Sequence, residues 1–252
     1  MAQSAKPTRL KPATLGAFHS YIREVEAEMK QTQLGSGSFL WSDASSERAQ
    51  KIRAGQIVAQ FWPGKGPAQV PNGLIHDWIA AAFLPATNLK KTLALIQNYD
   101  DHKNIYKPEV IDSKLISHHD NDFRIYLRLL KKKIMTVVLD TDHKVHYNSP
   151  DPTRWLCHSY TTRIAEVENA GSPEETVLPP DTGYGFLWRL NSYWRFQERD
   201  AGVYLECRAI SLTRDVPLGL GWIIQPIIQN LPKESLIKTL ECTRQALHSK
   251  ER

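Results

Sequence analysis

The sequence predicts an α+β fold, in which a run of antiparallel strands is followed by a long final helix. Between residues 123 and 212, apolar and polar side chains alternate in segments that turn-like clusters separate, which is typical of half-buried antiparallel strands. After Pro232, apolar residues return at helical spacing, at Leu236, Leu240 and Leu247. Strands and helices that are segregated along the chain favour α+β over a parallel α/β sheet.

Residues 1–66 are predicted to form a tail and a helical extension, and residues 67–252 the main domain. From Leu15 to Met29, apolar residues recur on one face of a helix. A shorter helix is expected over Ser46–Arg53. The run Pro63-Gly64-Lys65-Gly66-Pro67 interrupts any regular element, so the domain boundary is placed there.

The main domain is predicted to begin with a strand over residues 73–80 and a short helix. Thr87 is expected to cap that helix, which carries Leu89, Leu93 and Ile96 on one face. The final helix is expected to begin at Pro232, because proline fits the first turn of a helix. Further strands are expected over residues 123–129, 134–139, 155–167, 185–196 and 203–212.

The chain is mildly basic, with a formal net charge of +5. Its charges are dispersed, and no basic stripe is interleaved with aromatic residues, so nucleic-acid binding is not expected. The densest basic run, Lys131 to Lys133, lies between two predicted strands and is expected to form a solvated hairpin tip. No run of 18 apolar residues is present, and the first residues lack the apolar core of a signal peptide. We expect a soluble chain without a transmembrane segment, cytoplasmic unless an export signal was trimmed from it.

Motifs for metals, cofactors and phosphate groups are absent. The chain has 3 cysteines and no CxxC pair, which predicts neither a disulfide framework nor a cysteine zinc site. His118-His119-Asp120 and Asp140-Thr141-Asp142-His143 contain metal-ligand residue types, but both are read as turns. Phosphate-loop, dinucleotide and nucleophile-elbow motifs are missing. The sequence therefore predicts no metal and no cofactor.

Two segments near the C-terminus resemble the START-like, polyketide-cyclase-like (SRPBCC) superfamily. One is Gly202 to Pro217 with the following Gly219-Leu220-Gly221-Trp222, and the other is Phe186 to Phe196. The resemblance covers about residues 70–250. It implies a helix-grip fold, in which a curved antiparallel sheet wraps a long C-terminal helix, with a cavity between them that takes an apolar ligand.

The alternation along the strands predicts which side chains face that cavity. In the segment 186–196, the more apolar set begins at Phe186 and Trp188 and is expected to face the helix. Small residues at Cys207 and Ala209 would leave room for a ligand, and a filled core is the alternative. The residues expected to line the cavity are Trp188, Leu190, Trp194, Phe196, Leu205, Cys207, Tyr126, Trp222, His76 and Arg208.

The charged residues allow two interpretations. Glu206, Arg208 and Arg189 fall on the opposite parity, which predicts a surface ion pair. With the parity reversed, Arg208 would receive a ligand carboxylate or phosphate. His76 is expected to be a structural histidine, and the alternative is that it acts as an acid or base beside the cavity.

These features favour a binder or carrier of a lipid or another hydrophobic small molecule over an enzyme. The Gly/Pro-rich segment 217–226 is a candidate gate, and transient contact with a membrane surface is expected. The alternative is a cyclase or aromatase acting on an apolar substrate, with His76, Tyr126 or Glu206 transferring a proton. No catalytic residue is assigned. Residues 14–55 are expected to cover the cavity or to bind a partner helix, with an ordinary packing role as the alternative.

Overall fold

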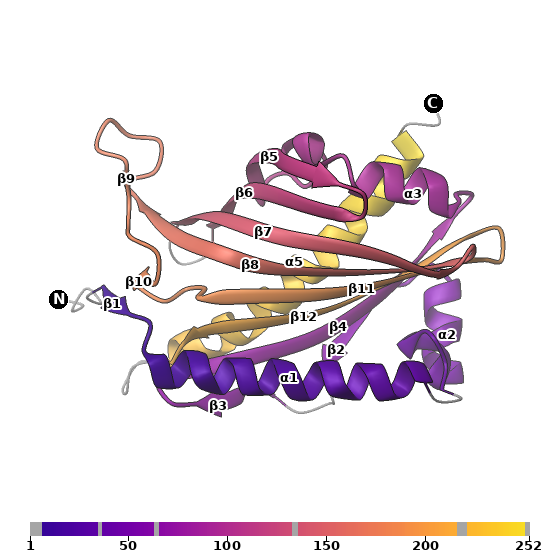
Figure 1. The fold of residues 1–252 in the computed structure, drawn as a ribbon, viewed down its shortest axis with the longest axis horizontal. Helices are drawn as coiled ribbons and strands as arrows, with labels where there is room; N and C mark the ends of the chain where they lie inside the picture. Colours follow the sequence, from indigo (N-terminus) through magenta and orange to yellow (C-terminus); the bar gives the residue numbers. More distant parts are fainter. Residues whose placement is uncertain (1–6, 35–36, 63–65, 133–135, 216–220, 250–252) are drawn as a thin grey trace.

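The sheet of this protein is antiparallel and strongly curved. The computed structural model describes residues 7–34, 37–62, 66–132, 136–215 and 221–249, except for the side chains of residues 32–34 and 221–229. Within these ranges, the main path of the sheet runs β2-β4-β12-β11-β8-β7-β6-β5 (Figure 1). Strands that follow one another pair as hairpins along β5 to β8 and again from β11 to β12, while β4 returns beside β12.

The strand bounds match the predicted ones closely for β8 and β12, whereas β7 continues well beyond its predicted end at residue 139. The main strands are β2 (Val58–Phe61), β4 (Gly73–Pro85), β5 (Val110–His119), β6 (Asp122–Lys132), β7 (Thr136–Asp151), β8 (Arg154–Glu168), β11 (Arg189–Arg199) and β12 (Gly202–Arg214). Two short strands extend this sheet, β3 (Ala68–Val70) on β4 and β9 (Thr176–Val177) on β8. Strands β1 (Thr8–Arg9) and β10 (Thr182–Gly183) form a separate pair.

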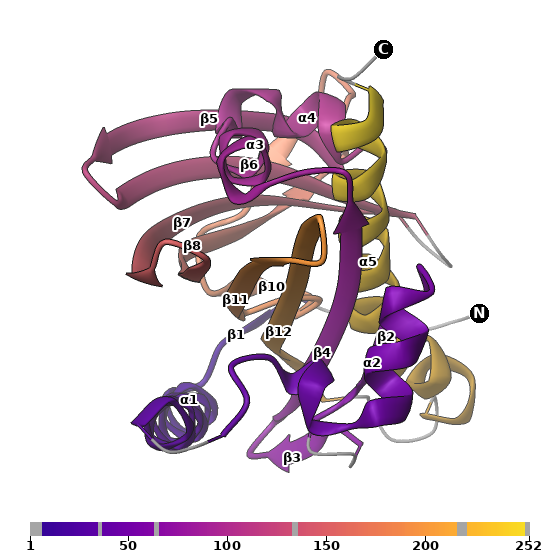
Figure 2. The ribbon, with the colours of Figure 1, turned by 90° about the vertical axis from the view of Figure 1, so that its right-hand side faces the viewer.

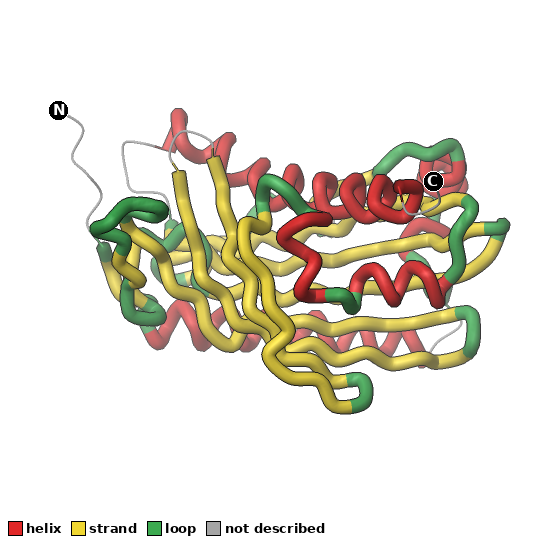
Figure 3. Tube along the Cα trace, turned by 90° about the horizontal axis from the view of Figure 1, so that it is seen from above, coloured by secondary structure: helices red, strands yellow, loops and turns green. Residues whose placement is uncertain are grey.

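Helices cover both faces of the sheet. The C-terminal helix α5 (Gly221–Ser249) lies on the concave face with α3 (Leu89–Ile96) and α4 (His102–Ile105), whereas α1 (Pro12–Leu34) and α2 (Ser46–Arg53) lie on the other face. Figure 2 shows α5 and α1 on opposite sides of the strands. Figure 3 shows helical segments on either side of the sheet from above. We call the face toward α5 the inner face and the face toward α1 and α2 the outer face.

The inner face carries the largest apolar cluster. Leu236, Leu240 and Leu247 of α5 pack against alternate residues of β4, β12 and β11. The α5 side chains that the structure describes are buried at the spacing expected for one helical face. Helix α5 packs mainly on β4, β12 and β2, where Ala80 and Ala82 are fully buried. Their small size allows the helix to lie close to the sheet.

The outer face is a second buried layer. Phe18, Ile22 and Val25, on one face of α1, pack against β4 and β12 residues that include Ile75 and Leu212. Farther along, residues from the segment before α2 and from α2 itself cover Ile79, Ala81 and Tyr204. Residues 14–55 therefore pack on the side of the sheet opposite the expected cavity, and they do not cover it.

The parts of the chain before and after the predicted boundary near residue 66 pack against each other. Strand β2, which precedes the boundary, pairs with β4 from Val58↔Ala81 to Phe61↔Trp78. Helices α1 and α2 are packed on the same sheet. The division into an extension and a main domain stays a prediction, but the two parts share buried interfaces.

Several sequence-based boundaries are wrong, and each has a local reason. The cap of α3 is Asn88, whose side chain accepts a hydrogen bond from Lys91 N, and not Thr87. Helix α5 begins at Gly221, so Pro232 lies inside it and not in its first turn. The run Asp140 to His143 belongs to β7 and is not a turn. Part of the candidate gate, residues 217–220, lies outside the described residues.

Candidate functional site

The inner face of the central strands is the candidate ligand surface. Strand register places Ala209 of β12 between Trp78 of β4 and Ser192 of β11. Two residues along, Ser211 lies between His76 and Leu190. Alternation then gives a continuous face of residues that lie opposite α5. Its members in these strands are His76, Trp78, Ala80, Ala82, Leu205, Cys207, Ala209, Ser211, Leu190, Ser192, Trp194 and Phe196.

Part of this inner face is open. Five of its residues remain partly exposed although they lie on central strands, and we call them the open patch: Leu190, Ser192 and Trp194 of β11, Ser159 of β8 and Ala209 of β12. Neighbouring residues of the same face, such as Ala80, Cys207 and Phe196, are buried. Water therefore reaches the middle of the concave face over β11, while α5 lies over β4 and β12. Small-molecule sites are lined mainly by apolar and aromatic side chains, such as Leu190 and Trp194 of the open patch.

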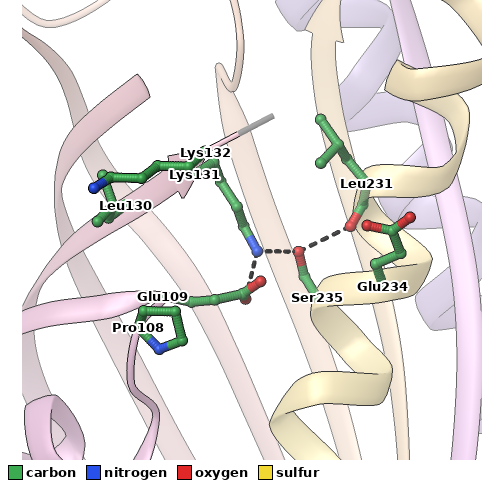
Figure 4. A pocket seen from close by; sticks show the side chains of 8 residues that line it. All are labelled: Pro108, Glu109, Leu130, Lys131, Lys132, Leu231, Glu234 and Ser235. Atoms are coloured by element: carbon green, nitrogen blue, oxygen red, sulfur yellow. Dashed lines mark hydrogen bonds and ion pairs between the residues drawn. The ribbon is translucent and has the colours of Figure 1, made fainter. Parts of the chain in front are cut away.

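One hollow that the described residues line is small. It has a volume of about 160 Å³ and lies between the ends of β5 and β6 and the helix α5. Figure 4 shows the Lys131 ammonium group pointing from β6 to Glu109 and to Ser235 of α5. Lys131 therefore ties the sheet to α5, and it is not part of a solvated hairpin tip. Lys133, the last residue of the basic run, lies outside the described residues. Drug-sized ligands need roughly 300–1,000 Å³, so this hollow is not itself the ligand site.

Three residues expected in the cavity lie on the outer face. Trp188 packs with the α1 cluster, because β11 begins only at Arg189 and the alternation does not extend back to Trp188. Tyr126 donates a hydrogen bond of 2.7 Å to Asp140 Oδ1 and flanks Arg128, away from α5. Arg208 is paired with Asp77 beneath α1.

The other expected cavity residues divide into two groups. Leu190 and Trp194 belong to the open patch, whereas Phe196, Leu205 and Cys207 are fully buried on the inner face. The side chain of Trp222 lies outside the described residues. The ligand-binding role of these residues stays a prediction.

The outer face contains a buried ionic cluster instead of a surface ion pair. Arg208 donates to both carboxylate oxygens of Asp77, with Nη2 to Oδ2 at 2.7 Å, and Tyr21 of α1 donates to the same carboxylate at 2.8 Å. Nearby, the Glu206 carboxylate accepts backbone N–H groups of Trp41 and Ser42. Arg189 pairs with Asp181. The predicted parity of Glu206 and Arg208 places them correctly, but the extension buries them.

Three buried histidines lie in the inner layer, of which the sequence interpretation placed only His76 beside the cavity. Burial lowers the pKa of each to about 4, with His102 adding to the effect on His143. Nε2 of His143 is hydrogen-bonded to the hydroxyl oxygen of Thr141 at 2.9 Å, and Nε2 of His102 is hydrogen-bonded to the carbonyl oxygen of Ile96 at 2.8 Å. The alternation in β7, where His143 lies in register with Ile125, was the signal that could have placed it inward.

Because these histidines are buried, the protein is expected to become less stable as the pH is lowered. A histidine whose pKa is lower in the folded state stabilises fully above about pH 6.5, and this contribution is lost as the pH falls toward 4. Between pH 7 and pH 5, each of the three histidines is expected to lower the free energy of unfolding by about 2 kcal/mol. Urea unfolding at several pH values measures this. His143→Gln should remove about 2 kcal/mol of this loss, and His248→Gln, at an exposed position, is the matched control. Equal stability at pH 7 and pH 5 would contradict the burial of neutral imidazoles.

The arrangement defines a class of fold: a curved antiparallel sheet that grips a C-terminal helix, the START-like, helix-grip fold. The aromatase/cyclase Zhui from Streptomyces sp. R1128 superposes with a TM-score of 0.50 and 8% identity, over 71% of this chain and 96% of that chain. A STAR-related lipid transfer protein from Xanthomonas axonopodis gives a TM-score of 0.47 at 14% identity, over 73% and 99% of the two chains. Human STARD10 gives 0.46 at 10% identity, over 86% of each.

Sequence comparison adds no closer relative. No protein-family model matches the chain, and no curated protein sequence is similar to it. The likeness to Zhui therefore shows the fold. Within the described residues, no helix is both long and apolar enough to cross a bilayer, and no three His, Cys, Asp or Glu side chains are grouped to hold a metal ion.

Proposed function

We propose that this protein binds a hydrophobic small molecule, such as a lipid, between the open patch of the sheet and α5. The observation that carries the proposal is the open patch itself. Trp194, Leu190 and Ala209 are apolar, lie on the concave face of central strands, and are still reached by solvent. Covering such a surface with an apolar ligand is favourable by about 25 cal/mol per Å².

The likeness in fold to solved structures also supports this proposal. The solved structure of the same fold is an aromatase/cyclase by its description, and the lower-scoring likenesses include lipid transfer proteins. Binding without chemistry is the simpler proposal for this chain. Of the three proton-transfer candidates, only His76 lies on the inner face, because Tyr126 and Glu206 face outward. Exchange of a lipid ligand at a membrane surface is part of this proposal.

Quenching of tryptophan fluorescence tests the proposal at the level of the site. A bromoalkane quenches an indole only on contact, so 1-bromododecane bound at the open patch should quench Trp194 in a saturable way. Trp194→Phe is expected to remove most of that quenching. Trp188→Phe is the matched control, because Trp188 lies on the outer face beneath α1.

The outcomes separate three situations. Saturable quenching that depends on Trp194 supports binding at the inner face. Quenching that depends on Trp188 instead would place the ligand on the outer face and contradict the proposed site. An absence of saturable quenching, together with unchanged migration of the probe in gel filtration, would contradict the proposed function.

A further inference from the structure

Two buried polar atoms on the inner face of β4 have no hydrogen-bond partner among the residues that the structure describes. They are Nδ1 of His76 and Nε1 of Trp78. His76 is fully buried and Trp78 is 4% exposed. The two residues are two positions apart on one strand, so both side chains extend from the inner face. A buried polar atom that stays unpaired costs about 1–3 kcal/mol, and such atoms are rare in folded proteins.

The hydrogen bonds around His76 establish which atom carries its proton. The Thr213 hydroxyl donates to the carbonyl oxygen of Arg214 at 3.2 Å, so its oxygen accepts from His76 Nε2 at 3.1 Å. The imidazole is neutral, since burial lowers its pKa to about 4. With the proton on Nε2, Nδ1 is a bare acceptor.

Trp78 offers the complementary group. An indole nitrogen only donates, so Trp78 Nε1–H is an unpaired donor. The Phe61 ring lies against the indole with ring centroids 3.8 Å apart, and the Lys233 ammonium lies over its ring at 5.6 Å. These contacts occupy the faces of the ring and leave the N–H without a partner.

The two unpaired atoms adjoin the open patch. In the register of the sheet, Trp78 lies opposite Ala209, and Ala209 lies opposite Ser192. His76 lies opposite Ser211, which in turn lies opposite Leu190. The residues that carry the unpaired acceptor and donor therefore lie one strand away from the open patch.

We propose that the ligand carries a hydroxyl group, which donates to His76 Nδ1 and accepts from Trp78 Nε1–H. This inference rests on the proposed function and adds the class of ligand, a neutral hydrophobic alcohol. A hydroxyl is the smallest group that supplies both a donor and an acceptor. A carboxylate only accepts, so it would leave His76 unpaired and would also bury a charge at considerable cost.

Matched probes test the donor and the acceptor separately. 1-Dodecanol and its methyl ether, 1-methoxydodecane, compete for the bound 1-bromododecane, and only the alcohol can donate to His76. The wild-type protein is expected to bind the alcohol about tenfold more tightly than the ether. His76→Phe should reduce this ratio to about one, because it removes the acceptor.

Trp78→Phe should act differently. Both probes accept a hydrogen bond from the indole N–H. This variant should therefore lower the affinity for each probe by about threefold to tenfold and keep the ratio between the two affinities. Trp188→Phe is the control and should change neither affinity. Retained binding of 1-bromododecane shows that each variant is folded and keeps the apolar site.

The two proposals fail in distinguishable ways. If 1-bromododecane binds and the wild-type protein shows equal affinities for alcohol and ether, the hydroxyl subsite is wrong and the apolar site stands. The same holds if the preference for the alcohol survives in His76→Phe. If none of the three probes binds, the proposed function is wrong as well.

Discussion

Asp77→Ala is expected to lower the free energy of unfolding by about 3–5 kcal/mol, because it leaves the Arg208 guanidinium buried without its partner. The two side chains are 3% and 5% exposed, and α1 covers them. The next carboxylate, Glu28, lies 3.6 Å from Arg208 but is half exposed, so it compensates little. Urea unfolding of the purified variant measures the loss.

Two further variants show whether burial is the cause. The exposed ion pair Asp142–Arg163, at 3.6 Å, is the matched control, and Asp142→Ala should cost less than about 1 kcal/mol. The double variant Asp77→Leu with Arg208→Met should recover most of the stability, since it leaves no unpaired charge. Similar costs for Asp77→Ala and Asp142→Ala would show that α1 does not bury the pair in solution.

Ala209→Trp is expected to abolish ligand binding while preserving the fold. The new indole would occupy the centre of the open patch, between Trp78 and Ser192. Displacing a ligand from about 100 Å² of apolar surface costs about 2.5 kcal/mol, or about 70-fold in affinity. The change is measured by titrating the variant with 1-bromododecane. Gel filtration is used to detect the bound probe, because the added indole would alter the fluorescence signal.

The stability of this variant is as informative as its affinity. In an open space the added ring should change the free energy of unfolding by less than about 1 kcal/mol, whereas overpacking a filled core costs about 1–3 kcal/mol. Lys144→Trp, at an exposed position on the outer face of β7, is the control for an added tryptophan. A destabilised Ala209→Trp that still binds the probe would contradict an open site.

The order of elements could be predicted from the sequence because strands and helices have different periods. Helix α1, helix α2 and strands β8 and β12 lie within a few residues of their predicted positions. The start of α5 could not, since Pro226 interrupts the apolar pattern and Pro232 was placed in the first turn, although both lie within the helix. Strand β5 was missed because two bulges, one beside Asp112 and one beside Ser117, break its alternation.

The site was harder to predict, because alternation shows which residues share a face but not what covers that face. Arg208 and Glu206 were assigned the correct parity, yet the sequence did not show that the extension would bury them. Trp188 was misplaced because it precedes β11 by one residue, so its direction is not set by the strand. The unpaired atoms of His76 and Trp78 depend on distant Thr213 and Phe61, which no local pattern reveals.

The ligand site is tested most directly by the mass of the intact protein under native conditions, measured beside mass spectrometry of its organic-solvent extract. We expect a bound apolar molecule at one per chain, released by the solvent, and absent from Ala209→Trp. A wild-type protein that carries no such molecule and takes up neither 1-dodecanol nor 1-bromododecane when they are added would contradict a ligand site on the inner face of the sheet.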